Sequence, residues 1–245
     1  YKESDVDDNY SVLYGSLGNL YNIQDQNLLA IEYYQKALPI FEKYGWLESQ
    51  SILYHNVGEL YITMGNREEA EHNYLLAIEC GRKSGDSLMV ALPQRGLAKI
   101  YLDKGDYDKA LQTGMESYAY YQPNQKDEPG DYTELLSILT QIHLMSGHKD
   151  LSKAEAYAEE AYHLLLNDED MMGSFKSNVL SAMYLVAMEK GQWQRAYDLA
   201  RESVEADPND TQDDISDYEN LARICLQLGR KEEAGQYINK VHDLD

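Results

Sequence analysis

The sequence predicts an all-α protein, a solenoid of about 12 antiparallel helices, and three observations lead to this prediction. Apolar and small residues recur at an offset of 40 residues along the chain. Within each copy they are spaced three and four residues apart, which is the period of a buried helix face. No segment alternates apolar and polar residues with a period of two over any length, so no strand is expected.

The first three copies show the pattern most clearly. Large residues surround a small one in the first half of each copy, and alanines follow in the second half. The members are Tyr14, Leu17, Gly18, Tyr21, Ala30, Tyr34 and Ala37, then Tyr54, Val57, Gly58, Tyr61, Ala70, Tyr74 and Ala77, then Leu97, Ala98, Tyr101, Gly105 and Ala110. Small residues let two helices approach closely, so each copy is predicted to be a packed helix pair.

The last three copies are looser but keep the small residues. Their members are Leu136, Leu139, Thr140, Gly147, Ala154, Ala158 and Ala161, then Leu180, Met183, Tyr184, Gly191, Ala196, Ala200 and Pro208, then Tyr218, Leu221, Ala222, Gly229 and Ala234. We therefore expect a single repeat domain over residues 1–245, with repeats near 11–44, 51–84, 91–122, 133–167, 177–208 and 215–245.

Turns separate the predicted helices within and between the pairs. Inside a pair, a glycine provides a left-handed helix end and the polar residue after it begins the next helix. These dipeptides are Gly65-Asn66, Gly105-Asp106, Gly147-His148, Gly191-Gln192 and Gly229-Arg230. The final helix is expected at about Lys231 to Leu244. The tyrosines of the repeated positions are predicted to fill space between helices, with each hydroxyl reaching a backbone group or water.

The pattern of a large residue, Leu-Gly, Tyr, Ala, an aromatic residue, Ala and Pro resembles the tetratricopeptide repeat. The resemblance covers roughly residues 8 to 245 and implies a right-handed superhelical stack of helix pairs. The copies depart from the family in length, at about 40 residues against about 34. Longer helices or longer turns between repeats must absorb the difference.

Charge and cysteine content limit the class of partner. Asp and Glu number 43 against 21 Lys and Arg, which gives a formal net charge of −22. Such a chain repels phosphate backbones and anionic lipid headgroups, so we expect neither nucleic acid nor direct membrane contact. The acidic surface fits either a basic partner or simply solubility. Cys80 and Cys225 stand outside any metal or redox spacing, and both are expected as buried thiols.

Sequence motifs give no catalytic, metal or cofactor site. Gly85-Asp86-Ser87-Leu88 matches a serine esterase block, but it falls in a turn where Asp86 or Ser87 is expected to cap the next helix. The segment from Asp168 to Gly173 resembles half of a calcium loop but has Met172 at the fifth position. The six histidines show no zinc-binding spacing. We therefore expect a protein that is not an enzyme and that carries no cofactor.

The resemblance also implies where a partner binds. In the family, the first helix of each pair lines the concave groove, and its positions two, five, nine, twelve and thirteen usually point into that groove. Positions two, five and nine are considered for this chain. Transferred to this chain, these positions nominate four polar residues and three apolar ones, namely Asn19, His55, Arg95, Lys99, Val12, Ile52 and Leu92.

One subset of the family grips a peptide's C-terminal carboxylate, and this chain keeps only part of that pattern. Asn19, Arg95 and Lys99 match, but Gly15 replaces a lysine and Glu59 replaces an asparagine. Glu59 repels a carboxylate and is expected to pair with Lys99 or Arg95. Two interpretations stay open: the polar residues hold an acidic or amide-rich stretch of a partner, or they form an internal salt-bridge lattice with Glu59 and Asp103.

We expect the chain to be a protein-interaction scaffold that binds a protein or peptide partner. Similar arrays in bacteria suggest, by analogy, the docking or sensing part of a larger regulator. The alternative is a sensor domain for a small ligand, a peptide or sugar. The final helix has apolar residues and no further helix to cover them, so the chain is expected to continue or to oligomerise there. The sequence starts at Tyr1, and cytoplasmic and periplasmic locations both remain open.

Overall fold

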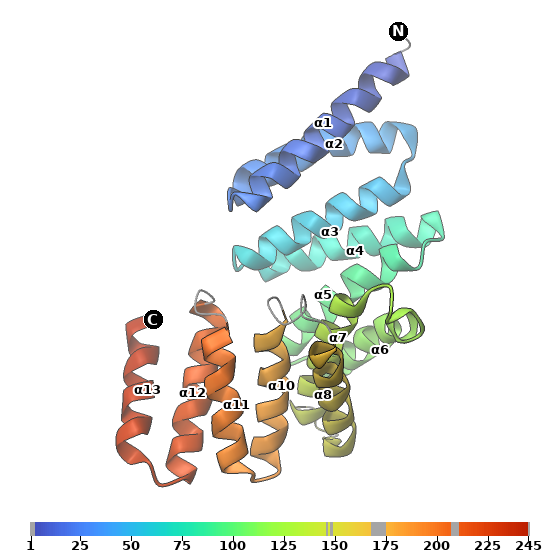
Figure 1. Cartoon of the computed structure of the whole chain (residues 1–245). Coiled ribbons are helices and arrows are strands. Elements are labelled where there is room, and N and C mark those ends of the chain that lie inside the picture. The colour runs from blue at the N-terminus through green and yellow to red at the C-terminus, as the bar shows by residue number, and fades with distance from the viewer. Residues whose placement is uncertain (1–2, 146, 148, 168–174, 207–210, 245) are drawn as a thin grey trace. The chain divides into compact units, whose positions relative to one another are not determined.

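The computed structural model describes residues 3–145, 147, 149–167, 175–206 and 211–244, and this part of the chain is helical with no strand (Figure 1). The helices are paired in chain order. They are α1 (Glu3–Ile23), α2 (Asn27–Tyr44), α3 (Leu47–Thr63), α4 (Arg67–Ser84), α5 (Leu88–Asp103), α6 (Tyr107–Asn124), α7 (Pro129–Met145), α8 (Leu151–Leu166), α10 (Lys176–Glu189), α11 (Trp193–Ala206), α12 (Thr211–Gln227) and α13 (Lys231–Leu244). The predicted all-α array of antiparallel helix pairs is thus confirmed.

Longer helices, and not longer turns, absorb the extra length of each repeat. Helix α3 has 17 residues and α4 has 18. The link from α2 to α3 consists only of Gly45 and Trp46, because α3 already begins at Leu47, ahead of the expected repeat start at 51. The additional residues therefore lengthen the helical faces that can pack or bind.

The turn chemistry follows the prediction at four of the five glycines named in the sequence. Gly65, Gly105, Gly191 and Gly229 adopt φ angles of 73°, 74°, 68° and 78°, the left-handed region that glycine occupies without strain. Side-chain oxygens then cap the next helix: Asn66 accepts from the amide of Glu69, and Asp106 accepts from that of Lys109.

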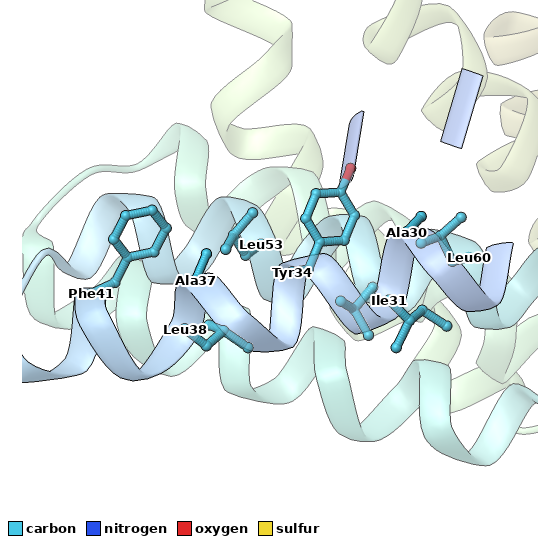
Figure 2. Packing of buried hydrophobic residues seen from close by; sticks show 9 residues of the cluster. Ala30, Ile31, Tyr34, Ala37, Leu38, Phe41, Leu53 and Leu60 are labelled. Carbon is cyan, nitrogen blue, oxygen red and sulfur yellow. The ribbon is translucent and has the colours of Figure 1, made fainter. Parts of the chain in front are cut away.

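Small residues create the space that the tyrosines fill. Tyr34 and Tyr74 are fully buried, at 0% and 1% exposure. A Cβ on Gly18 would lie 2.4 Å from the Tyr34 ring, and one on Gly58 would lie 2.6 Å from the Tyr74 ring. Figure 2 shows Tyr34 in the cluster of buried residues, where Ala30, Leu53 and Leu60 also lie.

Cα packing divides the chain into two compact units, Tyr1–Lys104 with Gln112–Tyr120, and Gly105–Leu111 with Tyr121–Asp245. In the first unit, α3 packs on α4, and α4 packs on α5. In the second, α7, α8 and α10 pack together, and α11 packs against both α10 and α12. A single domain over residues 1–245 remains a prediction.

Two features of the sequence analysis lie outside the described residues, namely the calcium-loop candidate from 168 to 173 and His148. Among the described residues, no group of three or more His, Cys, Asp or Glu side chains is placed to hold a metal ion. No helix in the described part is long and apolar enough to span a membrane.

Candidate functional site

The seven candidate residues all lie on α1, α3 and α5, the first helices of the first compact unit. On each helix the nominated positions follow the spacing i, i+3 and i+7, which places them on one face. We call this set, together with Glu59 at position nine of α3, the first-helix row: Val12, Asn19, Ile52, His55, Glu59, Leu92, Arg95 and Lys99.

The apolar members of the first-helix row present side chains to solvent. Val12 is 62% exposed and Ile52 is 42% exposed, while Leu92 is half-buried. An exposed isoleucine on a helix whose other apolar residues are buried or half-buried is not needed by the core. These residues therefore remain available for contact with another molecule.

Asn19 on α1 is held from behind by a buried tyrosine. The hydroxyl of Tyr34 donates to Oδ1 of Asn19 at 2.6 Å, whereas the Asn19 side chain itself is exposed. Burial raises the pKa of Tyr34, and a hydrogen bond with Asn56 lowers it in part. The tyrosine thus holds the amide oxygen of a side chain that is itself exposed.

Glu59 on α3 is held in the same way. The hydroxyl of Tyr74 donates to Glu59 Oε1 at 2.6 Å, and His55 Nε2 lies 3.7 Å from the same oxygen. The His55 ring stacks on Tyr74, with ring centroids 5.6 Å apart. Burial raises the pKa of Tyr74 well above its ordinary value, the Glu59 charge raises it further, and Arg95 lowers it. Tyr74 therefore stays protonated and remains the donor.

The two cations of the row differ in burial. Arg95 is only 8% exposed, as is His55, so these two present little surface to a partner. Lys99 is exposed over 42% of its side chain, and its Nζ lies 3.8 Å from Asp103 Oδ1. Asp103 also lies 3.4 Å from Arg67 Nε.

The expected pairing of Glu59 with Lys99 or Arg95 is wrong. Glu59 instead accepts a hydrogen bond from the hydroxyl of Tyr74, on α4, and lies near His55 on its own helix. The Lys99–Asp103 contact of the internal-lattice interpretation does form, but only at 3.8 Å. The tyrosine hydroxyls were expected to bond backbone groups or water. Those of Tyr34 and Tyr74 instead donate to the side chains of Asn19 and Glu59.

Sequence reasoning did not identify Tyr34 and Tyr74 as members of the site. A regularity in the sequence could have found them: Asn19 and Tyr34 are 15 residues apart, and so are Glu59 and Tyr74. In the first two helix pairs, the position-nine residue and the tyrosine 15 positions later are therefore hydrogen-bond partners.

The esterase-like block has a structural role. Asp86 Oδ1 accepts from the amide of Leu88 at 2.8 Å and from that of Met89 at 3.4 Å. Its carboxylate is thus committed to capping α5, as the sequence predicts. Nothing in this turn places a base and an acid beside Ser87 among the contacts of the described residues.

Comparison with protein families agrees with the fold. The stack of helix pairs defines a helical-repeat protein. Two models of the tetratricopeptide repeat match, one at residues 49–122 and the other at residues 12–43 and 218–245, together more than half of the chain. The chain belongs to the tetratricopeptide repeat family. No curated protein sequence matches it.

Solved structures with the same fold include two that are described in complex with peptides. The apo form of RapI is 15% identical with a TM-score of 0.76, covering 100% of this chain and 84% of RapI. The NprR structure in complex with its cognate peptide NprX is 13% identical with a TM-score of 0.72, covering 99% of this chain and 68% of NprR. The Rap conjugation gene regulator of the plasmid pLS20, in complex with the Phr* peptide, is 14% identical with a TM-score of 0.68, covering 100% and 65%. At these identities the likeness shows the fold.

Proposed function

We propose that the chain is a protein-interaction scaffold that binds a peptide, or an extended segment of a partner protein, along the first-helix row. The observation that carries this proposal is the pair of buried tyrosines that hold Asn19 and Glu59 in place. Their hydroxyls hold one oxygen of each of these two exposed side chains. Such fixing reduces the conformational entropy that a side chain loses when it binds a partner.

The rest of the row supplies the other contacts that an extended segment needs. Val12, Ile52 and Leu92 offer apolar surface at position two of the three helices. Lys99 offers an exposed ammonium group on an otherwise acidic protein. Amide, carboxylate, ammonium and apolar groups together suit a polypeptide, which presents backbone amides and side chains of each kind.

The structural neighbours support the same class of function. One is described in complex with its cognate peptide and another as a regulator bound to a peptide. By analogy, this chain serves as the docking or sensing part of a larger bacterial regulator. The proposed class of function is non-enzymatic, and the capping role of Asp86 in the esterase-like block supports this proposal.

A sensor for a small ligand remains the alternative function. The cavity that could hold such a ligand lies away from the first-helix row. A cavity of about 460 Å³ lies among Gly45, Trp46, Glu48, Lys83 and neighbouring residues at the link from α2 to α3. Its lining includes no member of the first-helix row. Binding of a compound there would be independent of Lys99.

Co-purification with an exposed-charge variant tests the proposal. Lys99→Glu reverses the exposed cation of the row, whereas Arg95→Glu would place an acid at a site that is only 8% exposed and endanger the fold. Lys83→Glu on α4 is the matched control, because Lys83 is also an exposed lysine four residues from an acidic partner. We expect a partner bound by wild type and Lys83→Glu and lost with Lys99→Glu. Equal binding by all three proteins contradicts the proposal.

A further inference from the structure

We propose that Glu59 makes the first-helix row selective for a partner segment that carries a basic side chain beside an acidic one. The inference rests on the proposed function and specifies the partner's chemistry. It concerns the three residues at position nine of α1, α3 and α5, which are the neutral Asn19, the negative Glu59 and the positive Lys99.

Glu59 has an oxygen available for a cation. Its Oε1 takes the hydrogen bond from Tyr74 and lies nearest to His55. Its Oε2 accepts no hydrogen bond from the described residues, and 47% of the side chain is exposed. A carboxylate with one oxygen fixed and one open is oriented to accept from a lysine or arginine of a partner.

Lys99 supplies the opposite charge on the neighbouring first helix of the row. Its only close acid, among the contacts of the described part, is Asp103 at 3.8 Å, beyond hydrogen-bond distance. A better-placed carboxylate can therefore displace Asp103 at little cost. The helices α3 and α5 that carry Glu59 and Lys99 are in contact, so one extended segment can reach both.

This order of charges disfavours a free C-terminal carboxylate as the anchor. A carboxylate placed between Asn19 and Lys99 would lie beside the helix that carries Glu59, and repulsion between the two like charges weakens binding. A basic side chain at that point removes the repulsion. For a half-exposed pair, we expect the gain to be about two- to fivefold in affinity.

Tyr74 is a positioning residue in this scheme, since it touches Glu59 and not the partner. Its ring packs against Gly58 and Gly96, which leaves the hydroxyl little freedom to move away from Glu59. Tyr74→Phe removes the hydrogen bond and keeps the ring. It should reduce the preference for a basic side chain while leaving the contribution of the partner's acidic side chain intact.

A double-mutant cycle between protein and peptide tests the inference. The probe is a library of random 10-residue peptides, acetylated at the N-terminus and anchored through the C-terminus, so that neither terminus carries a charge. The tightest wild-type binder is remade with its Lys or Arg replaced by norleucine. Both versions are measured by fluorescence polarisation against wild type, Glu59→Gln and Glu42→Gln. Glu42 is the matched control because it also accepts a tyrosine hydroxyl, from Tyr54, but lies on α2.

We expect norleucine to weaken binding about two- to fivefold for wild type and Glu42→Gln, and to change binding little for Glu59→Gln. The inference is overturned if norleucine has the same effect on all three proteins, since the basic side chain then responds to the overall acidic charge. If the library yields no peptide that binds wild type, the proposed function itself fails. The two failures are thus distinguishable.

Discussion

The hydroxyl of Tyr74 on α4 donates to Oε1 of Glu59 on α3 at 2.6 Å, and this bond links the core of the first unit to the first-helix row. The ring of Tyr74 occupies the space above Gly58, and the hydroxyl at its end emerges beside position nine. Tyr34 and Asn19 repeat the arrangement one helix pair earlier. Packing and the proposed partner recognition therefore depend on the same side chains.

A methyl group at Gly58 should disturb both. The Cβ of Gly58→Ala would lie 2.6 and 2.7 Å from the Tyr74 ring carbons, so the ring or the helix must shift. We expect a loss of about 1–3 kcal/mol in the free energy of unfolding, measured by urea denaturation. Gly15→Ala is the control, since nothing lies within 4 Å of its added Cβ and alanine favours the helix. A stable Gly58→Ala protein would contradict the packing described above.

Removing the hydroxyl alone should have a smaller effect. Tyr74→Phe keeps the buried ring and removes one hydrogen bond to a half-exposed carboxylate. The expected loss is about 0.5–1.5 kcal/mol in the free energy of unfolding, because water can solvate Glu59 in its place. Tyr34→Phe should behave alike. A loss as large as that of Gly58→Ala would indicate that the hydroxyl, and not the ring, holds the helix pair together.

In the second unit, Tyr184 and Asp217 should be energetically coupled. The Tyr184 hydroxyl donates to Asp217 Oδ1 at 2.5 Å and accepts from Asn220 Nδ2 at 3.0 Å, and the three residues are buried. Tyr184→Phe should cost about 1–3 kcal/mol, since it deprives a buried carboxylate of a donor. The double variant with Asp217→Asn should cost less than the sum of the single variants. Additive losses in a thermal or chemical unfolding cycle would rule out the coupling.

The free energy of unfolding should decrease in acid because His143 becomes protonated. This side chain is 5% exposed and stacks on Tyr157, and burial and Lys153 lower its pKa, while Asp150 acts in the opposite direction. The unfolded chain then binds a proton at a higher pH than the folded one, so the free energy of unfolding decreases as pH falls below the ordinary value of 6.5. One such group contributes a slope of at most about 1.4 kcal/mol per pH unit.

His143→Gln should flatten this part of the pH profile between pH 7.5 and 5.5 in urea titrations. The exposed His72→Gln is the matched control and should leave the profile as in wild type. If His143→Gln and wild type lose stability in parallel, protonation of His143 is not the cause.

The sequence predicts the helix pairs and turns well because both depend on local spacing. Gly65 and Asn66 behave as their residue types suggest, and Asp86 caps α5 as expected. The sequence predicts less well which residues of the first-helix row are exposed. His55 and Arg95 share a helix face with exposed residues, yet both are nearly buried, since helix spacing does not show which neighbouring helix covers that face. The direction of the Tyr74 hydroxyl likewise depends on the relative placement of two helices.

The most direct test of the binding row is site-specific photo-crosslinking. A photoreactive phenylalanine derivative replaces Ile52, which is 42% exposed on the row, or Leu75, which is 48% exposed on the second helix α4. We predict that a protein or peptide from the source lysate crosslinks from position 52, does not crosslink from position 75, and is lost when Lys99→Glu is added. Crosslinking from position 75 alone, or from position 52 regardless of Lys99, would contradict binding along the first-helix row.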